Sequence, residues 1–108
     1  MAVKHVIVHQ KPNAVFASAE EARNDLQSQY PQALKDIINA WHTQLLANGI
    51  MLAPVECVWD QAANTISVIR TISDMAEYNQ SRPFTKEQTE QYQSAAGWAH
   101  LTAFVDSV

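Results

Sequence analysis

The residues best suited to chemistry are histidines in the first and last apolar segments of the chain. His5 and His9 alternate with apolar residues near the N-terminus, and His100 lies near the C-terminus. On one strand, His5 and His9 would share a face but stand roughly 13 Å apart, too far to hold one metal ion together. A metal site would need His100 beside one of them, with Glu56 or Asp106 as a third ligand. Because no HxH pair and no HxxxH pair on a helix occurs, ordinary polar positions are the simpler interpretation, and no metal is predicted.

A histidine can also act without a metal ion. A neutral imidazole can take a proton from a phenol or a quinol as a general base. His5, His9 and His100 are therefore candidate catalytic residues, provided that the fold brings them to one pocket.

Arg70 interrupts an apolar segment that contains Ile66 and Val68. A charge among buried positions must be paired or must face a ligand. A salt bridge to Glu56 or Asp60 across a hairpin is the simpler explanation. The functional explanation is an anchor for an anionic group or for developing oxyanion charge, which makes Arg70 a fourth candidate catalytic residue.

Three aromatic residues near the expected strands are candidates to line a ligand pocket: Trp59, Trp98 and Phe104. Aromatic residues at such positions mostly fill a core or an interface, so this assignment competes with a packing role. The single cysteine, Cys57, lies in an apolar segment and is expected to be a buried, inert thiol.

Composition excludes several classes of function. The 108 residues suffice for one domain, and the formal net charge is -4. The seven Lys and Arg residues form no cluster, so nucleic-acid binding is not expected. There is no glycine-rich phosphate loop, nucleophile elbow or CxxC pair, and no cofactor is predicted. The N-terminal apolar run is too short for a signal sequence or a membrane span, which favours a cytoplasmic protein without membrane contact.

The strands that must position these residues are indicated by β-branched runs. Val3–His9 reads as a first strand, and Met51–Trp59 with Thr65–Ile72 reads as a hairpin around a short polar link. Which residues of Met51–Trp59 face inward stays open, since Val55, Cys57 and Trp59 compete with Glu56, Val58 and Asp60. The segment Trp98–Val108 alternates as a strand, with a continued helix as the competing interpretation.

Helix boundaries are marked by capping residues and prolines. Ser18 begins a capping box, and Pro31 predicts a break after Tyr30 before a second helix that ends at Gly49. Asp74 and Thr85 begin two further short helices by the same capping pattern.

The resulting order of strand, helix, strand, strand, helix, strand predicts an α+β, ferredoxin-like βαββαβ fold in one domain, residues 1–108. The antiparallel sheet has the predicted order 4-1-3-2, with both helical regions on one face. The other face would carry Ile7 and Phe104. An uncovered apolar face favours a symmetric dimer of stacked sheets.

Two stretches carry a resemblance to a known superfamily. The closing strand Trp98–Val105 and the passage Ile66–Tyr78, from a strand through a polar turn into a helix, resemble the dimeric α+β barrel proteins, which include the antibiotic-biosynthesis-monooxygenase-like domains. The resemblance implies a homodimeric barrel. That superfamily includes oxygenases that act on aromatic quinols without a cofactor, haem enzymes, and members with no assigned function.

Two classes of function follow. The first is a monooxygenase-like domain that acts on or binds a small aromatic molecule, in a pocket placed on the open sheet face and lined by the three candidate histidines, Arg70 and Trp59. The second is a noncatalytic dimeric domain that binds a small ligand or serves as an accessory. Histidine and arginine side chains converging on a cavity would favour the first, and a filled interior would favour the second.

Overall fold

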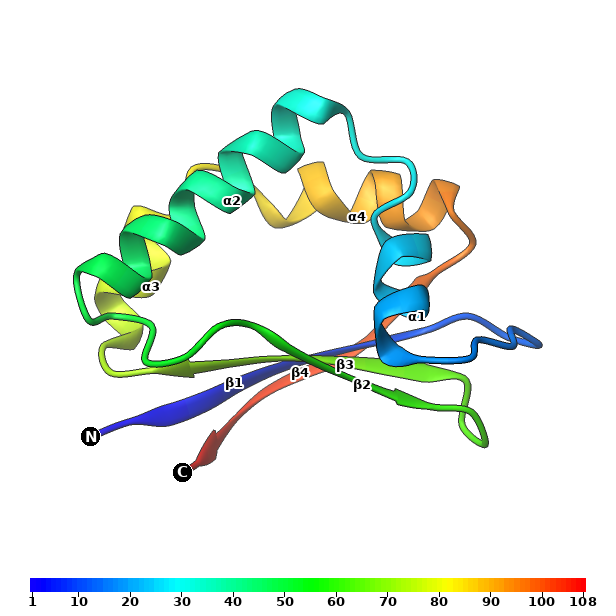
Figure 1. Cartoon of the computed structure of the whole chain (residues 1–108), viewed down its shortest axis with the longest axis horizontal. Coiled ribbons are helices and arrows are strands. Elements are labelled where there is room, and N and C mark those ends of the chain that lie inside the picture. The colour runs from blue at the N-terminus through cyan, green and yellow to red at the C-terminus, as the bar shows by residue number, and fades with distance from the viewer.

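The computed structural model describes all 108 residues as a succession of four strands and four helices (Figure 1). In chain order the elements are β1 (Val3–Gln10), α1 (Ala19–Leu26), α2 (Gln32–Ala47), β2 (Glu56–Asp60), β3 (Thr65–Ile72), α3 (Met75–Ser81), α4 (Lys86–Ala95) and β4 (Ala99–Ser107). The predicted order of strands and helical regions is confirmed, and the C-terminal segment is a strand rather than a helix.

The four strands form one antiparallel sheet in the order β2-β3-β1-β4. This is the order 4-1-3-2 predicted from the sequence, read from the opposite edge. The α+β architecture is compatible with a ferredoxin-like fold. β1 and β3 occupy the centre, so their faces are the ones that the rest of the chain can cover.

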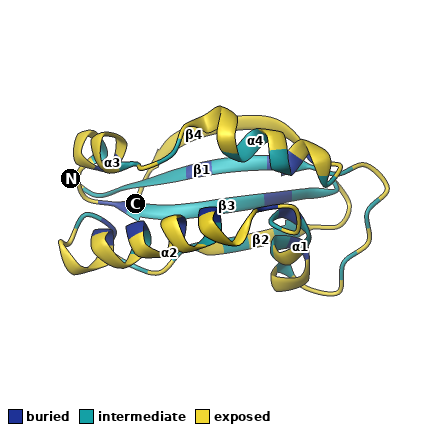
Figure 2. Ribbon diagram, turned by 90° about the horizontal axis from the view of Figure 1, so that it is seen from above, coloured by how far each residue is buried: buried dark blue, intermediate teal, exposed yellow.

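All four helices lie on the same face of the sheet (Figures 1 and 2). The C-terminal end of α2 lies close to the sheet, and its N-terminal end rises away from it, so α2 and α4 arch over the middle of the sheet. None of these helices combines the length and the apolar content that a transmembrane span requires.

Local capping fixes where three helices begin. The Ser18 hydroxyl accepts a hydrogen bond from the Glu21 amide at 3.1 Å, and the Asp74 carboxylate caps α3 in the same way. Thr85 and Gln88 form a reciprocal capping box at the start of α4. These three predicted starts are confirmed because capping depends on residues only three positions apart.

Proline and glycine divide the first helical region as predicted. Pro31 occupies the N-cap of α2, directly after Tyr30, where its ring excludes a continuous helix. Gly49 follows α2 with φ of +70°, and the Ile50 amide donates to the Leu45 carbonyl at 2.9 Å. This pattern terminates the helix with a left-handed residue, which a glycine adopts without steric cost.

The first strand of the hairpin is shorter than predicted. Regular pairing begins only at Glu56, while Met51 makes a single isolated bridge to Ile72. Pro54 lies between these points, and its missing amide hydrogen prevents a continuous ladder. The predicted extent Met51–Trp59 is therefore wrong at its N-terminal half.

The structure shows which residues of β2 face the helices and which face the open side of the sheet. Cys57 and Trp59 point toward the helices and are half-buried, whereas Val58 is 52% exposed on the open face. Phe104, 46% exposed, lies on the open face as predicted. Ile7 does not, because it shares the helix-covered face with the histidines of β1.

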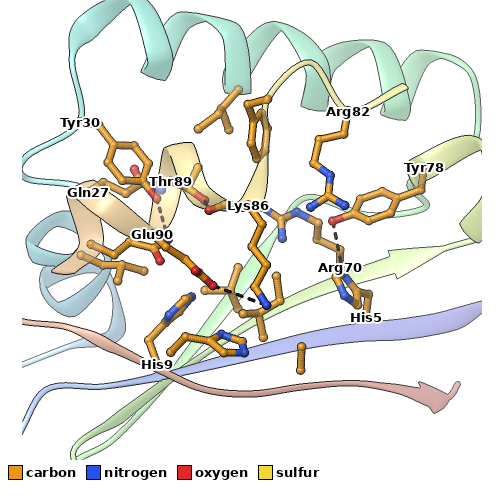
Figure 3. A pocket seen from close by; sticks show the side chains of 18 of the residues that line it. His5, His9, Gln27, Tyr30, Arg70, Tyr78, Arg82, Lys86, Thr89 and Glu90 are labelled. Atoms are coloured by element: carbon orange, nitrogen blue, oxygen red, sulfur yellow. Dashed lines mark hydrogen bonds and ion pairs between the residues drawn. The ribbon is translucent and has the colours of Figure 1, made fainter. Parts of the chain in front are cut away.

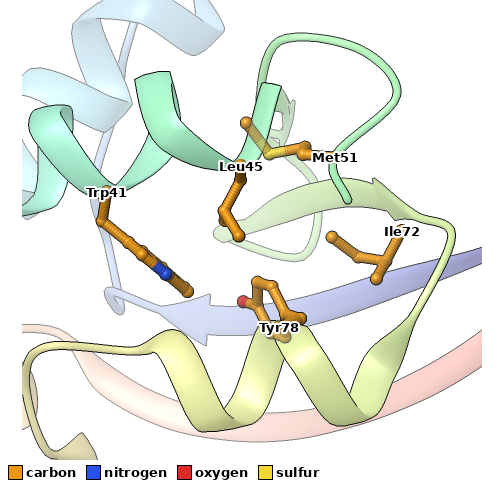
Figure 4. Close-up of a cluster of buried hydrophobic side chains, with 5 residues drawn as sticks. All are labelled: Trp41, Leu45, Met51, Ile72 and Tyr78. Atoms are coloured by element: carbon orange, nitrogen blue, oxygen red, sulfur yellow. The ribbon is translucent and has the colours of Figure 1, made fainter. Parts of the chain in front are cut away.

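The buried core is divided into three clusters rather than one. One cluster closes the sheet at the α3 end (Figure 4) and comprises Trp41, Leu45, Met51, Ile72 and Tyr78. A second closes the α1 end and comprises Ala22, Leu26, Ile66 and Trp98. The third joins α2 to the preceding link, above the sheet, and comprises Tyr30, Leu34 and Ile38. Between the clusters the interior is not filled, and the functional candidates converge there.

Candidate functional site

A partly enclosed cavity of about 250 Å³ lies between the sheet and the arch of helices (Figure 3). His5, His9, His100 and Arg70 all line it, so the four candidate catalytic residues share one space. The cavity is on the helix-covered face of the sheet. The prediction placed a pocket on the open face, whereas this cavity lies beneath the helices, where the divided core leaves room.

The cavity floor is a short ladder of paired residues on β1 and β3. His5 lies opposite Arg70, and Ile7 lies opposite Val68, on the same side of the sheet. His9 follows two residues later on that side. The floor is thus polar at both ends and apolar in the middle, which follows directly from the alternation in the sequence.

A β-bulge in β4 brings His100 to the cavity. Val8 pairs with Thr102 while the next residue, His9, pairs with His100, so Leu101 is an additional residue in the strand. The predicted strict alternation would put His100 on the same face as Thr102. The bulge separates them, and the rings of His9 and His100 meet edge to face with centroids 5.7 Å apart.

Arg70 has no carboxylate partner. Its Nε donates to Nε2 of His42 at 3.2 Å, and its guanidinium carbon lies 6.0 Å from the Trp41 ring centre. The expected salt bridge to Glu56 or Asp60 is wrong, since both of those side chains lie on the opposite side of the sheet. The half-buried charge of Arg70 therefore faces the cavity, supported only by a neutral ring and an aromatic face.

A second arginine, which sequence reasoning missed, joins the same end of the cavity. Arg82, directly after α3, lies near Arg70 and the His5–Tyr78 contact (Figure 3) and also has no carboxylate partner. It belongs to a link between helices, where no periodic pattern indicates which way a side chain points. No signal in the sequence identifies it.

Lys86 and Glu90 also line the cavity and form an ion pair with each other at 3.6 Å. Together with Arg70 and Arg82 they give the lining three cations against one carboxylate. The chain as a whole has a net charge of -4, so this cavity has the opposite sign to most of the surface.

Two of the cavity histidines, His9 and His5, are held neutral by their surroundings. Burial lowers the pKa of His9 to about 4, with added repulsion from His100 and Arg70. Burial, then Arg70 and Arg82, lower the pKa of His5, whose Nδ1 lies 3.3 Å from the Tyr78 hydroxyl. An imidazole of pKa about 4 is a hydrogen-bonding group at neutral pH and a weak base.

Neutral hydrogen-bonding side chains lie around His9, and the Lys86–Glu90 ion pair also lines the cavity. Gln93 donates from Nε2 to the Tyr30 hydroxyl at 2.8 Å, and burial raises the pKa of that phenol. His9 is only 4% exposed, and its Nδ1 is enclosed by protein without a partner, as is Oε1 of Gln93. His9 makes no hydrogen bond within the chain, so Nε2 is the ring nitrogen left at the cavity surface. Unpartnered polar groups of this kind are uncommon in a folded protein.

The three aromatic residues predicted to line the pocket lie elsewhere. Trp59 and Trp98 pack with Phe16 in the closed corner at the α1 end, and Trp98 donates from Nε1 to Asp25 at 3.0 Å. Phe104 lies on the open face. None of the three lines the cavity: Trp59 and Trp98 are part of the core at the α1 end, and Phe104 is on the other face of the sheet.

No group of three or more His, Cys, Asp or Glu residues comes together as a metal site. The carboxylates of Glu56 and Asp106 lie on the open side of the sheet, away from the pair of His9 and His100. Cys57 is half-buried, and burial raises the pKa of its thiol, in keeping with the predicted inert cysteine.

Comparison of the chain with protein-family models, with curated proteins and with solved structures finds no match. The cavity is therefore the feature from which the function has to be inferred.

Proposed function

We propose that this chain binds a small aromatic molecule in the cavity and acts on it as a monooxygenase-like domain. The observation that carries the proposal is the convergence of His5, His9, His100 and Arg70 on one cavity of about 250 Å³. Apolar floor residues Ile7 and Val68 would lie against the ring. A cavity with a few convergent polar groups and perturbed pKa values is the usual form of a small-molecule site.

The proposed reaction uses no cofactor. A histidine takes a phenolic proton from a quinol, and the electron-rich ring then reduces molecular oxygen. One oxygen atom enters the ring and the other leaves as water, so that a quinol becomes a hydroxyquinone and supplies all the electrons itself. Arg70 would stabilise the anion that forms.

One observation favours a noncatalytic alternative. With a pKa of about 4, His9 is a weaker base than proton abstraction at neutral pH prefers. A domain that only binds its ligand needs neutral hydrogen-bonding histidines and no strong base. Binding and turnover therefore have to be measured separately.

The test is binding and oxygen uptake with methylhydroquinone as the probe. Binding by calorimetry, together with oxygen consumption above the spontaneous rate and its loss in His9→Gln and His100→Gln, would support the enzyme. Binding without added oxygen consumption would support the noncatalytic alternative. The matched control is Lys35→Gln on α2, which lies outside the cavity lining and should leave both measurements unchanged. Absence of binding by any small phenol or quinol would overturn the proposal.

The proposal includes a second copy of the chain as partner. The open sheet face presents Val6, Val8 and Ile69 between the exposed side chains of Val58 and Phe104. A two-fold pair of stacked sheets would cover this apolar strip and complete a dimeric barrel.

Light scattering tests the dimer. Phe104→Lys should convert a dimer to a monomer by placing a charge in the interface. Val15→Lys, which changes an equally apolar but 81% exposed loop residue, should not. A wild-type monomer would overturn this part of the proposal and leave the cavity argument standing.

A further inference from the structure

The two ends of the cavity differ in charge, and this difference constrains the ligand. At one end Arg70 and Arg82 lie beside the His5–Tyr78 contact (Figure 3), and neither arginine has a carboxylate partner. A half-buried guanidinium without a counter-ion is costly unless an anion completes it. The planar fork of an arginine fits a carboxylate by two parallel hydrogen bonds.

At the other end His9 and Tyr30 offer hydrogen bonds from neutral groups, and the charges of Lys86 and Glu90 are paired with each other. His9 is neutral at pH 7 and presents Nε2 to the cavity, and the Tyr30 hydroxyl, which accepts from Gln93, can still donate. His100 stands beside His9. His9 and Tyr30 fit a hydroxyl, which both donates and accepts, and neither offers an anion a positive charge.

The middle of the floor is apolar and has the length of a ring. Ile7 and Val68 form the rung between the His5–Arg70 pair and His9. Four residues of strand separate His5 from His9, roughly 13 Å between Cα atoms, and the side chains at both ends reach inward from there. A cavity of about 250 Å³ is slightly smaller than the usual small-molecule pocket of about 300–1,000 Å³, which suits a ligand of one substituted ring.

The geometry points to an aromatic acid as the ligand: a ring that carries a carboxylate at one end and an uncharged hydroxyl at the other. The carboxylate is held by Arg70 and Arg82, and the hydroxyl by His9 and Tyr30. This inference rests on the proposed function, because it names the ligand class of the same cavity.

Matched ligands separate the contributions of the two ends. The probes are 4-hydroxyphenylacetate, its neutral amide, phenylacetate without the hydroxyl, and acetate without the ring, each titrated by calorimetry at constant ionic strength. We expect the hydroxy acid to bind about tenfold or more tighter than the amide, because a hydrogen bond between charged groups is stronger than one to a neutral amide. Loss of the hydroxyl should weaken binding by about fivefold.

Variants assign the effects to residues. Arg70→Gln and Arg82→Gln should each weaken the hydroxy acid by about tenfold or more while leaving the amide nearly unchanged. His9→Gln should remove most of the difference between the hydroxy acid and phenylacetate. Lys35→Gln, which makes the same charge change outside the cavity, should leave all affinities unchanged. If Arg70→Gln fails to fold by circular dichroism, Arg82→Gln alone decides, because its side chain contributes to none of the buried clusters.

Three outcomes would overturn this inference. If the amide binds as tightly as the acid, the anion site is wrong, while the proposed binding of a small aromatic molecule stands. If acetate binds as tightly as the hydroxy acid, the ring contributes nothing to binding and the ligand is not an aromatic acid. If no aromatic probe binds, neutral or anionic, the proposed function itself fails and the inference fails with it.

Discussion

Two regions on the helix-covered side of the sheet each contain a half-buried cation, but only one of these cations has a carboxylate partner. In the closed corner, Lys11 forms an ion pair with Asp25, whose carboxylate also accepts a hydrogen bond from Trp98. In the cavity, Arg70 contacts only the neutral ring of His42 and the face of Trp41. The cation of the corner thus has its counter-charge within the chain, and the cation of the cavity does not.

This difference separates packing from recognition. Asp25 satisfies two donors that the fold brings together, so its role is explained by stability alone. The cavity leaves two arginines without a carboxylate, which lowers stability unless an anionic ligand completes them, and it leaves Nδ1 of His9 and Oε1 of Gln93 without a partner. Sites that serve function are commonly less stable than they could be.

The largest expected effect is in the corner. Trp98→Ala should destabilise the protein by about 3–5 kcal/mol, because a large buried side chain and a hydrogen bond to Asp25 are lost together. Urea unfolding measures the change. The matched variant in the cavity, Arg82→Gln, should change stability by less than about 0.5 kcal/mol. Similar losses in both would contradict the distinction between the two regions.

The second effect is a dependence of the protein's stability on pH, caused by His9 in the cavity. The folded pKa of His9 is about 4 against an ordinary 6.5, so between these values the unfolded chain binds a proton that the folded chain does not. The stability from His9 is fully present above pH 6.5 and is lost as pH falls toward 4. At about 1.4 kcal/mol per pKa unit, the loss is about 3 kcal/mol.

The variant His9→Gln isolates the contribution of His9 to this pH dependence. Its free energy of unfolding, measured by urea titration from pH 7.5 to pH 4, should fall less steeply than that of the wild type. Carboxylates elsewhere act equally in both proteins, so the difference reports on His9. Parallel curves would mean that His9 is readily protonated in the folded protein.

The third prediction compares the two cations directly. Asp25→Asn removes the carboxylate from Lys11 and should cost about 1–2 kcal/mol, a moderate value because the pair is partly exposed. Arg70→Met removes a charge that has no carboxylate, so stability should change by less than about 1 kcal/mol and can rise. Thermal unfolding of both variants measures the contrast. A large loss in Arg70→Met would show that the arginine is structural.

The smallest effect concerns the glycine that closes the corner. Gly97→Ala should cost about 1 kcal/mol, because φ is +89° and an added Cβ would lie 3.3 Å from Cε of Lys11. Gly49→Ala, at φ of +70° with nothing within 4 Å, carries the backbone strain alone. Repeating Gly97→Ala in a Lys11→Ala background measures how much of its cost comes from the lysine. No change there would mean that strain is the whole effect.

The sequence predicted the parts of the fold that depend on near neighbours. Caps at Ser18, Asp74 and Thr85, the break at Pro31 and the turn at Gly49 were all confirmed, since each depends on a few consecutive residues. The strand order also followed from the order of elements and short connections. The extent of the hairpin did not, because Pro54 restricts a ladder whose partner lies far along the chain.

The site was predicted only in part. The shared face of His5 and His9 follows from strand alternation, and the approach of His100 was anticipated from the neighbouring strands. The bulge that turns His100 inward, and the direction of Arg82, depend on contacts between distant segments. Trp59 and Trp98 lie in the closed corner and not in the cavity, which the sequence could not decide because aromatic residues look alike there whether they fill a corner or line a cavity.

By itself the sequence determined an α+β chain with four strands in a definite order, and it placed two histidines and an arginine on regular strands. Local propensity and alternation suffice for that, because they act over a few residues. Only the tertiary structure decided that the core divides into clusters, that a cavity remains between them, and that Arg70 and Arg82 meet there without a carboxylate. Packing and charge pairing are properties of segments far apart in the chain, so no local pattern can encode them.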